Sequence, residues 1–161
     1  MDGEALRARR TALKMVDRRA YSARELVQRL EKRDHETADA ETAVRDLERA
    51  GIVNDRTLGE SVVRAELSRS PAGRVLLEMK LVKRGIDRVL AGEVVAEALG
   101  ERASDEDADE VARRHMKSFA PSLGREAVRR RLYGKLARRG FSPEVARGAV
   151  ERATEGLGVE E

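Results

Sequence analysis

The stretch from Ala127 to Ala153 has the pattern of two helices joined by a tight corner, and it constrains the fold more than any other part of the chain. Leu132 and Leu136 give the first helix an apolar stripe at i, i+4 spacing. Gly140 stands where the end of a helix favours left-handed backbone. Ser142-Pro143 then predicts a new helix, because serine caps free N–H groups and proline fits the first turn.

The same unit recurs twice earlier in the chain. Each middle helix carries two leucines four residues apart, followed three residues later by arginine. The leucine pairs are Leu26 and Leu30, Leu77 and Leu81, and Leu132 and Leu136, and the arginines are Arg33, Arg84 and Arg139. The repeat spacing is 51 and then 55 residues, which is typical of tandem three-helix units.

The helices that follow these corners share a second pattern. The predicted N-caps are Asp39, Asp87 and Ser142. In each copy, alanine lies four residues after the predicted N-cap, an aliphatic residue eight after it and alanine again eleven after it. These residues are Ala43, Ala91 and Ala146; Leu47, Val95 and Val150; and Ala50, Ala98 and Ala153. Such spacings mark one helical face, where small residues permit close packing.

We therefore predict an all-α protein of three tandem three-helix repeats that form an elongated, curved helical array. The predicted repeats span residues 1–51, 52–100 and 101–161. The first helix is expected from about Glu4 to Arg19, and a capping box from Ser22 to Glu25 opens the second. The third repeat should have an acidic N-terminal linker, a basic middle helix and a frayed C-terminus. The alternative is an irregular all-α domain whose helices share their core chemistry by chance.

Composition narrows the possible functions. The chain has no cysteine, which excludes disulfides and thiolate metal sites. Two Phe, two Tyr and no Trp require an aliphatic core. The sequence shows no apolar run of membrane-spanning length and no signal-peptide pattern, so we expect a soluble cytoplasmic protein.

We also expect no enzymatic activity, no cofactor and no metal. His35 lies in a predicted loop, and His115 is expected at a helix surface or boundary, with no thiol to pair with either. Neither G-x-x-x-x-G-K-[S/T] nor G-x-G-x-x-G occurs, so no phosphate-binding loop is predicted. The carboxylates of the Asp105-Glu106-Asp107 run point in different directions on a helix, and their spacing is not that of an EF-hand.

Basic helix faces carry the functional signal. Residues 125–139 contain seven basic residues and one glutamate, residues 74–84 contain four against one, and residues 23–34 contain four against three. A further patch at residues 7–24 holds seven basic residues and one aspartate. Too few carboxylates lie at i±3 or i±4 to pair the run Arg129 to Arg131. We favour a contact surface for phosphate or acidic protein over a merely solvated helix.

Each helix–corner–helix is also similar to a helix-turn-helix, whose second helix enters a major groove. Here the second helices are net acidic, which disfavours sequence-specific binding to duplex DNA. Only four aromatic residues are available as stacking platforms for single strands, and we expect Phe141 to close the corner instead. What remains is sequence-independent attraction to phosphate, or docking on an acidic protein surface.

Several motifs together resemble the RecX family. They are A-L-x-x-V…R-x-Y-S-x-x-E-L from Ala12 to Leu26, two copies of K-L-x-x-x-G-I/F at Lys80 to Ile86 and Lys135 to Phe141, and R-R-G-F-S from Arg138 to Ser142. The resemblance spans the chain. Two positions depart from the family pattern: Leu58-Gly59 replaces a Phe-Ala pair, and Ser70 to Gly73 replaces a basic or aromatic turn.

The resemblance implies three tandem three-helix repeats and a regulator of the RecA recombinase. Such proteins bind in the groove of the RecA filament on single-stranded DNA, restrain its ATPase and strand exchange, and promote filament disassembly. We expect a non-enzymatic, monomeric modulator in DNA repair and recombination, with RecA and single-stranded DNA as partners. The candidate contact residues are Arg129, Arg130, Arg131, Lys135, Arg138 and Arg139, with Lys80, Lys83 and Arg84.

Two other functions stay open. A plain nucleic-acid-binding module would bind bare DNA and filament with similar affinity and a steep salt dependence. A structural adaptor would dock an acidic protein and show no affinity for DNA at physiological salt.

Overall fold

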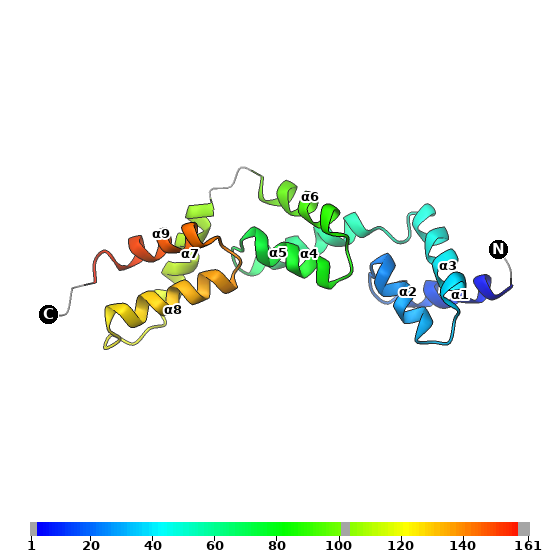
Figure 1. The fold of residues 1–161 in the computed structure, drawn as a ribbon, viewed down its shortest axis with the longest axis horizontal. Coiled ribbons are helices and arrows are strands. Elements are labelled where there is room, and N and C mark those ends of the chain that lie inside the picture. Colours follow the sequence, from blue (N-terminus) through cyan, green and yellow to red (C-terminus); the bar gives the residue numbers. More distant parts are fainter. Residues whose placement is uncertain (1–2, 101–103, 158–161) are drawn as a thin grey trace. The chain divides into compact units, whose positions relative to one another are not determined.

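The computed structural model describes residues 3–100 and 104–157, and these residues form α-helices and no strand (Figure 1). The helices are α1 (Gly3–Val16), α2 (Ala23–Glu31), α3 (Thr37–Arg49), α4 (Asp55–Arg69), α5 (Arg74–Lys83), α6 (Arg88–Leu99), α7 (Ser104–Met116), α8 (Arg125–Arg138) and α9 (Pro143–Thr154). The all-α prediction is confirmed, with three helices for each predicted repeat.

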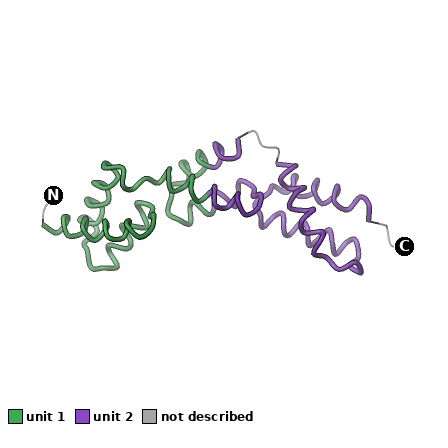
Figure 2. Tube along the Cα trace, turned by 180° about the vertical axis from the view of Figure 1, so that it is seen from behind, with its two compact units in different colours: residues 1–62, 80–94 green, residues 63–79, 95–161 purple. Residues whose placement is uncertain are grey.

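The chain divides into two compact units (Figure 2). One comprises residues 1–62 and 80–94, and the other comprises residues 63–79 and 95–161. The first unit contains α1, α2 and α3, the second contains α7, α8 and α9, and helices α4, α5 and α6 each contribute to both. The predicted repeat boundaries at residues 51 and 100 stay predictions, as does the expected outline of the whole array.

In the first unit, α3 packs against both α1 and α2. Leu26 and Leu30 of α2 are fully buried, as the leucine pattern predicted. Ser22 caps α2, since its hydroxyl accepts a hydrogen bond from the N–H of Glu25 while the Glu25 carboxylate accepts one from the N–H of Ser22. The predicted capping box is confirmed.

In the second unit, α9 packs against α7 and α8 around an aliphatic core. Leu132 and Leu136 are fully buried. Phe141 is 6% exposed and closes the corner between α8 and α9 as predicted. Met116 and Phe119 are half-buried against the same core.

The backbones around Gly73 and Gly140 lie close together in the second unit. The N–H of Gly73 donates to the carbonyl of Arg139 at 2.8 Å. A Cβ on Gly73 would lie 2.1 Å from the carbonyl oxygen of Gly140. Gly140 has φ +83°, and a Cβ there would lie 2.4 Å from the backbone nitrogen of Leu76. The turn from Ser70 to Gly73, which departs from the family pattern, is therefore suited to this contact.

Several helix ends differ from the sequence-based expectation. The first helix stops at Val16, where the N–H of Arg18 bonds back three residues to Met15. Helix α3 has Glu36 at its N-cap, so Asp39 lies in its first turn and is not the cap. Asp34, three residues after the end of α2, adopts φ 65°, and the chain turns there before α3 begins at Thr37.

The acidic segment of the third repeat is also corrected. From Ser104 onward it is the first part of α7, where carboxylates complement the N-terminal end of the helix dipole. Residues 101–103 of the expected linker lie outside the described residues. The predicted frayed end is described only as far as Leu157.

The alanine pattern is confirmed at four and eight residues after the predicted caps, where all six residues are buried. At eleven residues it is wrong for Ala50 and Ala98, which are exposed, and Ala153 is half-buried. Ala50 is the C-cap of α3 and Ala98 lies in the last turn of α6. These positions share the apolar face but lie at the ends of their helices.

Candidate binding surface

Four of the predicted basic residues, three of them exposed and Lys135 half-buried, lie near one another on α8. Arg131, Lys135 and Arg138 follow one another at spacings of four and three and therefore lie along one side of the helix, and Arg130 lies about 100° around the helix from Arg131. Arg130, Arg131 and Arg138 are exposed and form no hydrogen bond or ion pair with a described residue. We call Arg130, Arg131, Lys135 and Arg138 the cationic face of α8.

Arg129 and Arg139, also predicted contact residues, point elsewhere. The Arg129 guanidinium donates to the hydroxyl of buried Thr154 at 3.3 Å. It also lies 3.9 Å from the Glu126 carboxylate, and its side chain is 32% exposed. The run Arg129 to Arg131 is therefore divided: its first member packs toward α9, and the other two face solvent.

Arg139 holds α8 to the turn between α4 and α5. Its guanidinium donates to Glu66 at 2.7 Å, to the carbonyl of Ser70 at 2.8 Å and to the carbonyl of Pro71 at 3.0 and 3.1 Å. The side chains of Arg139 and Glu66 are 18% and 8% exposed. We call these contacts the Arg139 network. Because the guanidinium is enclosed, its charge serves the fold of the second unit.

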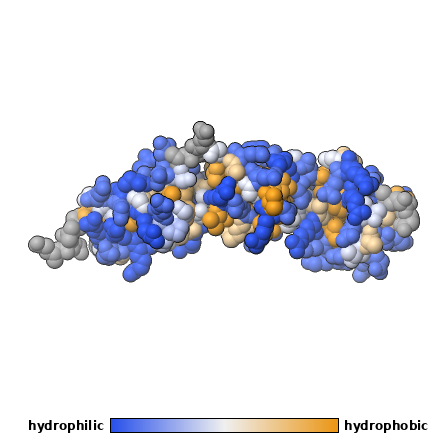
Figure 3. Space-filling view, turned by 45° about the horizontal axis from the view of Figure 1, so that its top comes forward, coloured by the Kyte–Doolittle hydropathy of each residue, from blue (hydrophilic) through white to orange (hydrophobic). Residues whose placement is uncertain are grey.

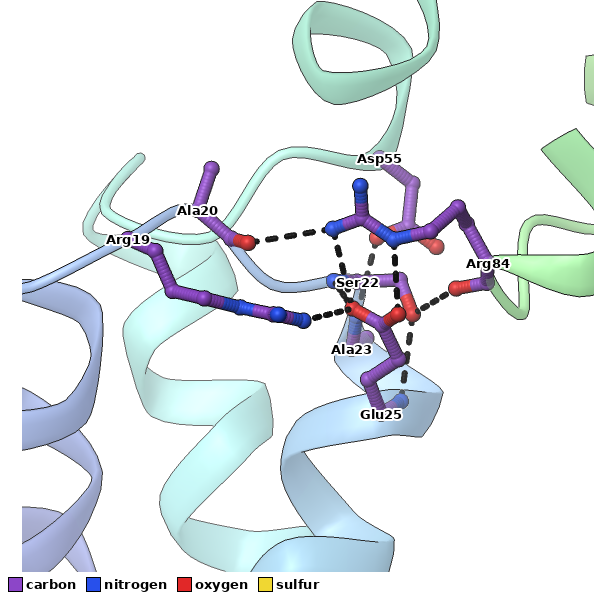
Figure 4. Close-up of polar contacts among 7 residues, drawn as sticks. All are labelled: Arg19, Ala20, Ser22, Ala23, Glu25, Asp55 and Arg84. Atoms are coloured by element: carbon purple, nitrogen blue, oxygen red, sulfur yellow. Dashed lines mark hydrogen bonds and ion pairs between the residues drawn. The ribbon is translucent and has the colours of Figure 1, made fainter. Parts of the chain in front are cut away.

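Arg84 makes a similar set of contacts in the first unit (Figure 4). Its guanidinium donates to Glu25 at 2.7 and 3.2 Å and to the carbonyl of Ala20 at 3.1 Å. Its own carbonyl accepts a hydrogen bond of 2.5 Å from the Ser22 hydroxyl. These contacts, the Arg84 network, join the end of α5 to the capping box of α2. Nearby, Asp55 accepts a hydrogen bond of 2.9 Å from the N–H of Ala23.

The Arg84 network keeps Glu25 ionised. Burial would by itself raise the pKa of this carboxyl, since it disfavours the charged form. The hydrogen bonds from Arg84 and from the N–H of Ser22, together with the positive charges of Arg84 and Arg19, outweigh that effect. The pKa of Glu25 is therefore lowered from its usual 4.5.

The two remaining candidates, Lys80 and Lys83, lie on α5. Lys83 is exposed, and Lys80 is half-buried. The structure thus brings together the four residues of the cationic face of α8, whereas Arg129 and Arg139 turn inward within the second unit and Arg84 is engaged within the first. Whether any of these residues contacts a partner stays a prediction.

His115 lies at a boundary, as expected, and is half-buried on α7. Burial lowers the pKa of its imidazole, and the charges of Lys135 and Arg139 lower it further. Both effects favour the neutral form of the imidazole. Within residues 3–100 and 104–157, no group of three or more His, Asp or Glu side chains is arranged to hold a metal ion. No helix of the described chain is long and apolar enough to cross a membrane.

The basic patch at residues 7–24 is partly used within the first unit. Arg9 pairs with Asp46 at 2.5 Å, and the Arg19 guanidinium lies 4.2 Å from the centroid of the Tyr21 ring. Arg29 covers the same ring at 5.4 Å. Tyr21 is therefore occupied by two guanidiniums, which makes it a poor platform for a nucleic-acid base.

Sequence reasoning missed the structural role of Arg84 and Arg139, although one signal could have revealed it. Both arginines stand three residues after the second leucine of a middle helix. A charge that recurs at the same position in a packed repeat points to a contact made by the repeat itself. Their acceptors, Glu25 and Glu66, lie 59 and 73 residues away in sequence, so no local pattern identifies them.

Comparison with known proteins agrees with these observations. A family model described as "RecX, third three-helix domain" matches residues 103–150. The regulatory protein RecX of Amycolatopsis mediterranei is 31% identical over 145 residues, covering 88% of this chain and 80% of the relative. That of Corynebacterium efficiens is 34% identical over 161 residues, covering 92% and 74%. The crystal structure of RecX from Lactobacillus salivarius has a TM-score of 0.76 at 17% identity, covering 94% and 97%.

Three-helix units with arginine networks, and with a basic helix face turned to solvent, define a helical-repeat protein. The sequence relatives make the class specific. The chain belongs to the RecX family of regulatory proteins, which confirms the resemblance found in its sequence.

Proposed function

We propose that this protein modulates the RecA recombinase by binding the RecA–single-stranded-DNA filament. It restrains the ATPase and strand exchange of the filament in DNA repair and recombination, and it has no catalytic activity of its own. Membership of the RecX family supports the choice of RecA as the target. The observation that carries the DNA part of the proposal is the cationic face of α8, where three arginines have no acceptor among the described residues.

The cationic face suits phosphate because of its chemistry. Arginine guanidiniums donate several hydrogen bonds at once to phosphate oxygens. A strip of four cations along one helix reads no base edges, so the binding it supports is independent of sequence. Individually weak contacts of this kind accumulate when a protein engages its partner at several places.

The direct test is hydrolysis of ATP by RecA on single-stranded DNA, with this protein titrated in at moderate salt. We expect inhibition at less than one molecule per RecA protomer. Absence of inhibition, together with salt-sensitive binding to bare DNA of equal affinity, would favour the plain nucleic-acid-binding module. Absence of both inhibition and DNA binding would favour the adaptor.

The variant R130Q/R131Q/R138Q tests the cationic face. The variant loses about three phosphate contacts. For single-stranded DNA, the slope of the logarithm of affinity against the logarithm of salt concentration should therefore become shallower by about 2. The matched control is R45Q/R49Q/R64Q, which removes the same charge from exposed residues of α3 and α4. If both variants change DNA binding equally, net charge is responsible and the cationic face has no particular role.

A further inference from the structure

Helix α5 carries an exposed hydrophobic stripe. Val75, Met79 and Val82 are 64%, 57% and 36% exposed. Because they belong to one continuous helix, their spacings of four and three residues alone place them along one side. We call these three residues the α5 stripe. Hydrophobic side chains also break the largely hydrophilic surface over the α4–α6 region in Figure 3.

Packing inside the repeat does not require this stripe. The core of α5 is supplied by Leu77 and Leu81 on the other side of the helix, which are 1% and 0% exposed. The leucine register also identifies the equivalent positions in the other middle helices. They are Arg24, Gln28 and Glu31 in α2, and Arg130, Gly134 and Ala137 in α8.

The repeat therefore accepts polar, charged or small residues where α5 has valine and methionine. Val75 and Met79 leave more than half of their surface exposed and Val82 leaves about a third, and this exposed hydrophobic surface gains nothing from the fold. Their hydrophobicity becomes useful only when something outside the chain covers them.

The chemistry of the stripe limits what that partner is. Hydrocarbon and thioether side chains offer no donor to phosphate, so DNA backbone is excluded. A second copy of this chain is a poor occupant, since α5 has ten residues and is about 15 Å long. One face of such a helix covers far less than the roughly 800 Å² per partner of a stable interface. Docking on a filament needs less area on α5, because the cationic face of α8 supplies further contacts to the same target.

The charges beside the stripe indicate the character of the partner. On one edge of the α5 stripe, Glu78 is paired with Arg74 at 3.5 Å, so the charges of these two residues cancel. Lys83 follows Met79 by one helical turn at the other edge, is exposed, and has no ion pair with a described residue. The complementary surface is hydrophobic with a carboxylate beside it, which is a property of a protein.

We infer that the α5 stripe docks on a hydrophobic, carboxylate-edged patch of the RecA protein, while the cationic face of α8 contacts the DNA of the same filament. This inference rests on the proposed function and divides its contacts between the two components. Two helices at equivalent positions of the repeat thus meet chemically different parts of one target.

The test uses the full-length variant V75Q/M79Q/V82Q. Glutamine has good helix propensity, so α5 should stay folded, and circular dichroism verifies this. The matched control is R24Q/E31Q, which leaves glutamine at all three equivalent positions of α2. Affinity is measured for RecA filaments on single-stranded DNA and for the same oligonucleotide without RecA.

We expect the α5 variant to lose about tenfold or more in filament affinity, because hydrophobic burial worth at least 1.4 kcal/mol is removed. Its affinity for bare DNA should equal that of the unaltered protein, and the control should bind both normally.

Undiminished filament binding by the α5 variant would overturn the inference and leave the proposed function intact. A dimeric parent protein that becomes monomeric in the α5 variant, measured by sedimentation, would assign the stripe to self-association and also overturn it. If the unaltered protein binds bare DNA more tightly than filament, the proposed function is wrong, and the inference that rests on it is wrong as well.

Discussion

Substituting Arg139 tests whether this residue serves the fold or a partner. In R139M the four hydrogen bonds to Glu66, Ser70 and Pro71 are lost, while the aliphatic part of the side chain is kept. The carboxylate of Glu66, whose side chain is 8% exposed, then loses the guanidinium of Arg139. Removing one partner of a buried ion pair costs about 3–5 kcal/mol.

The expected effect is large enough to measure by thermal unfolding. For a chain of this length 1 kcal/mol corresponds to about 2–4 °C in Tm, so the lower limit of 3 kcal/mol predicts a decrease of about 6–12 °C. The assay is helical circular dichroism during heating, with urea unfolding as a second measure. The control is R138M, which alters the neighbouring exposed arginine and should change stability by less than about 0.5 kcal/mol.

A double variant separates lost charge from lost packing. In R139M/E66M no charge is left buried, so this protein should be more stable than R139M although it carries one more substitution. If R139M lowers stability no more than R138M does, the Arg139 network is not structural. Arg139 would then return to the group of partner-contacting candidates.

Three further predictions concern single sites, each checked by unfolding. G73A should destabilise the second unit strongly, since its Cβ would lie 2.1 Å from a backbone oxygen. G59A should instead raise the free energy of unfolding by at most about 1 kcal/mol, because Gly59 is in a helix and its Cβ would meet side chains at an ordinary 3.4–3.5 Å. S22A should cost about 1 kcal/mol through loss of the α2 cap. Because the pKa of Glu25 is lowered, its ionised form stabilises the fold fully above about pH 4.5, and this stabilisation is lost as the pH falls through the lowered pKa. In E25Q the free energy of unfolding should therefore depend less on pH in the acid range. An equal acid slope in E25Q and the parent protein would contradict the role given to Arg84.

Local signals predicted local structure well. The capping box of α2 lies within four residues, and the buried leucines of the middle helices repeat at i, i+4, so the sequence alone determines both. Asp39 shows where such reasoning stops. It is a good capping residue, but the reversal at Asp34 starts α3 earlier, so a neighbouring backbone conformation outweighed side-chain preference.

The candidate site was predicted less completely, because sequence gives the number of charges but not their partners. Arg131 and Arg139 are both arginines of one basic segment. One is exposed, and the other is enclosed by a carboxylate and two carbonyls that come from residues 66–71. Only the packing of α8 against the α4–α5 turn distinguishes them. The α5 stripe was overlooked for the opposite reason, since hydrophobic residues on a helix are ordinarily assigned to the core.

The two arginine networks also bear on how the chain folds as it is synthesised. Glu66 is added to the growing chain 73 residues before Arg139, and Glu25 is added 59 residues before Arg84. At about 5–20 residues per second, the longer gap lasts about 4–15 s. During this interval the carboxylate of Glu66 cannot be buried against a guanidinium that does not yet exist. The C-terminal part of α4, which belongs to the second unit, therefore gains its contact with Arg139 only when α8 is made, and a nascent chain halted before residue 139 lacks that contact.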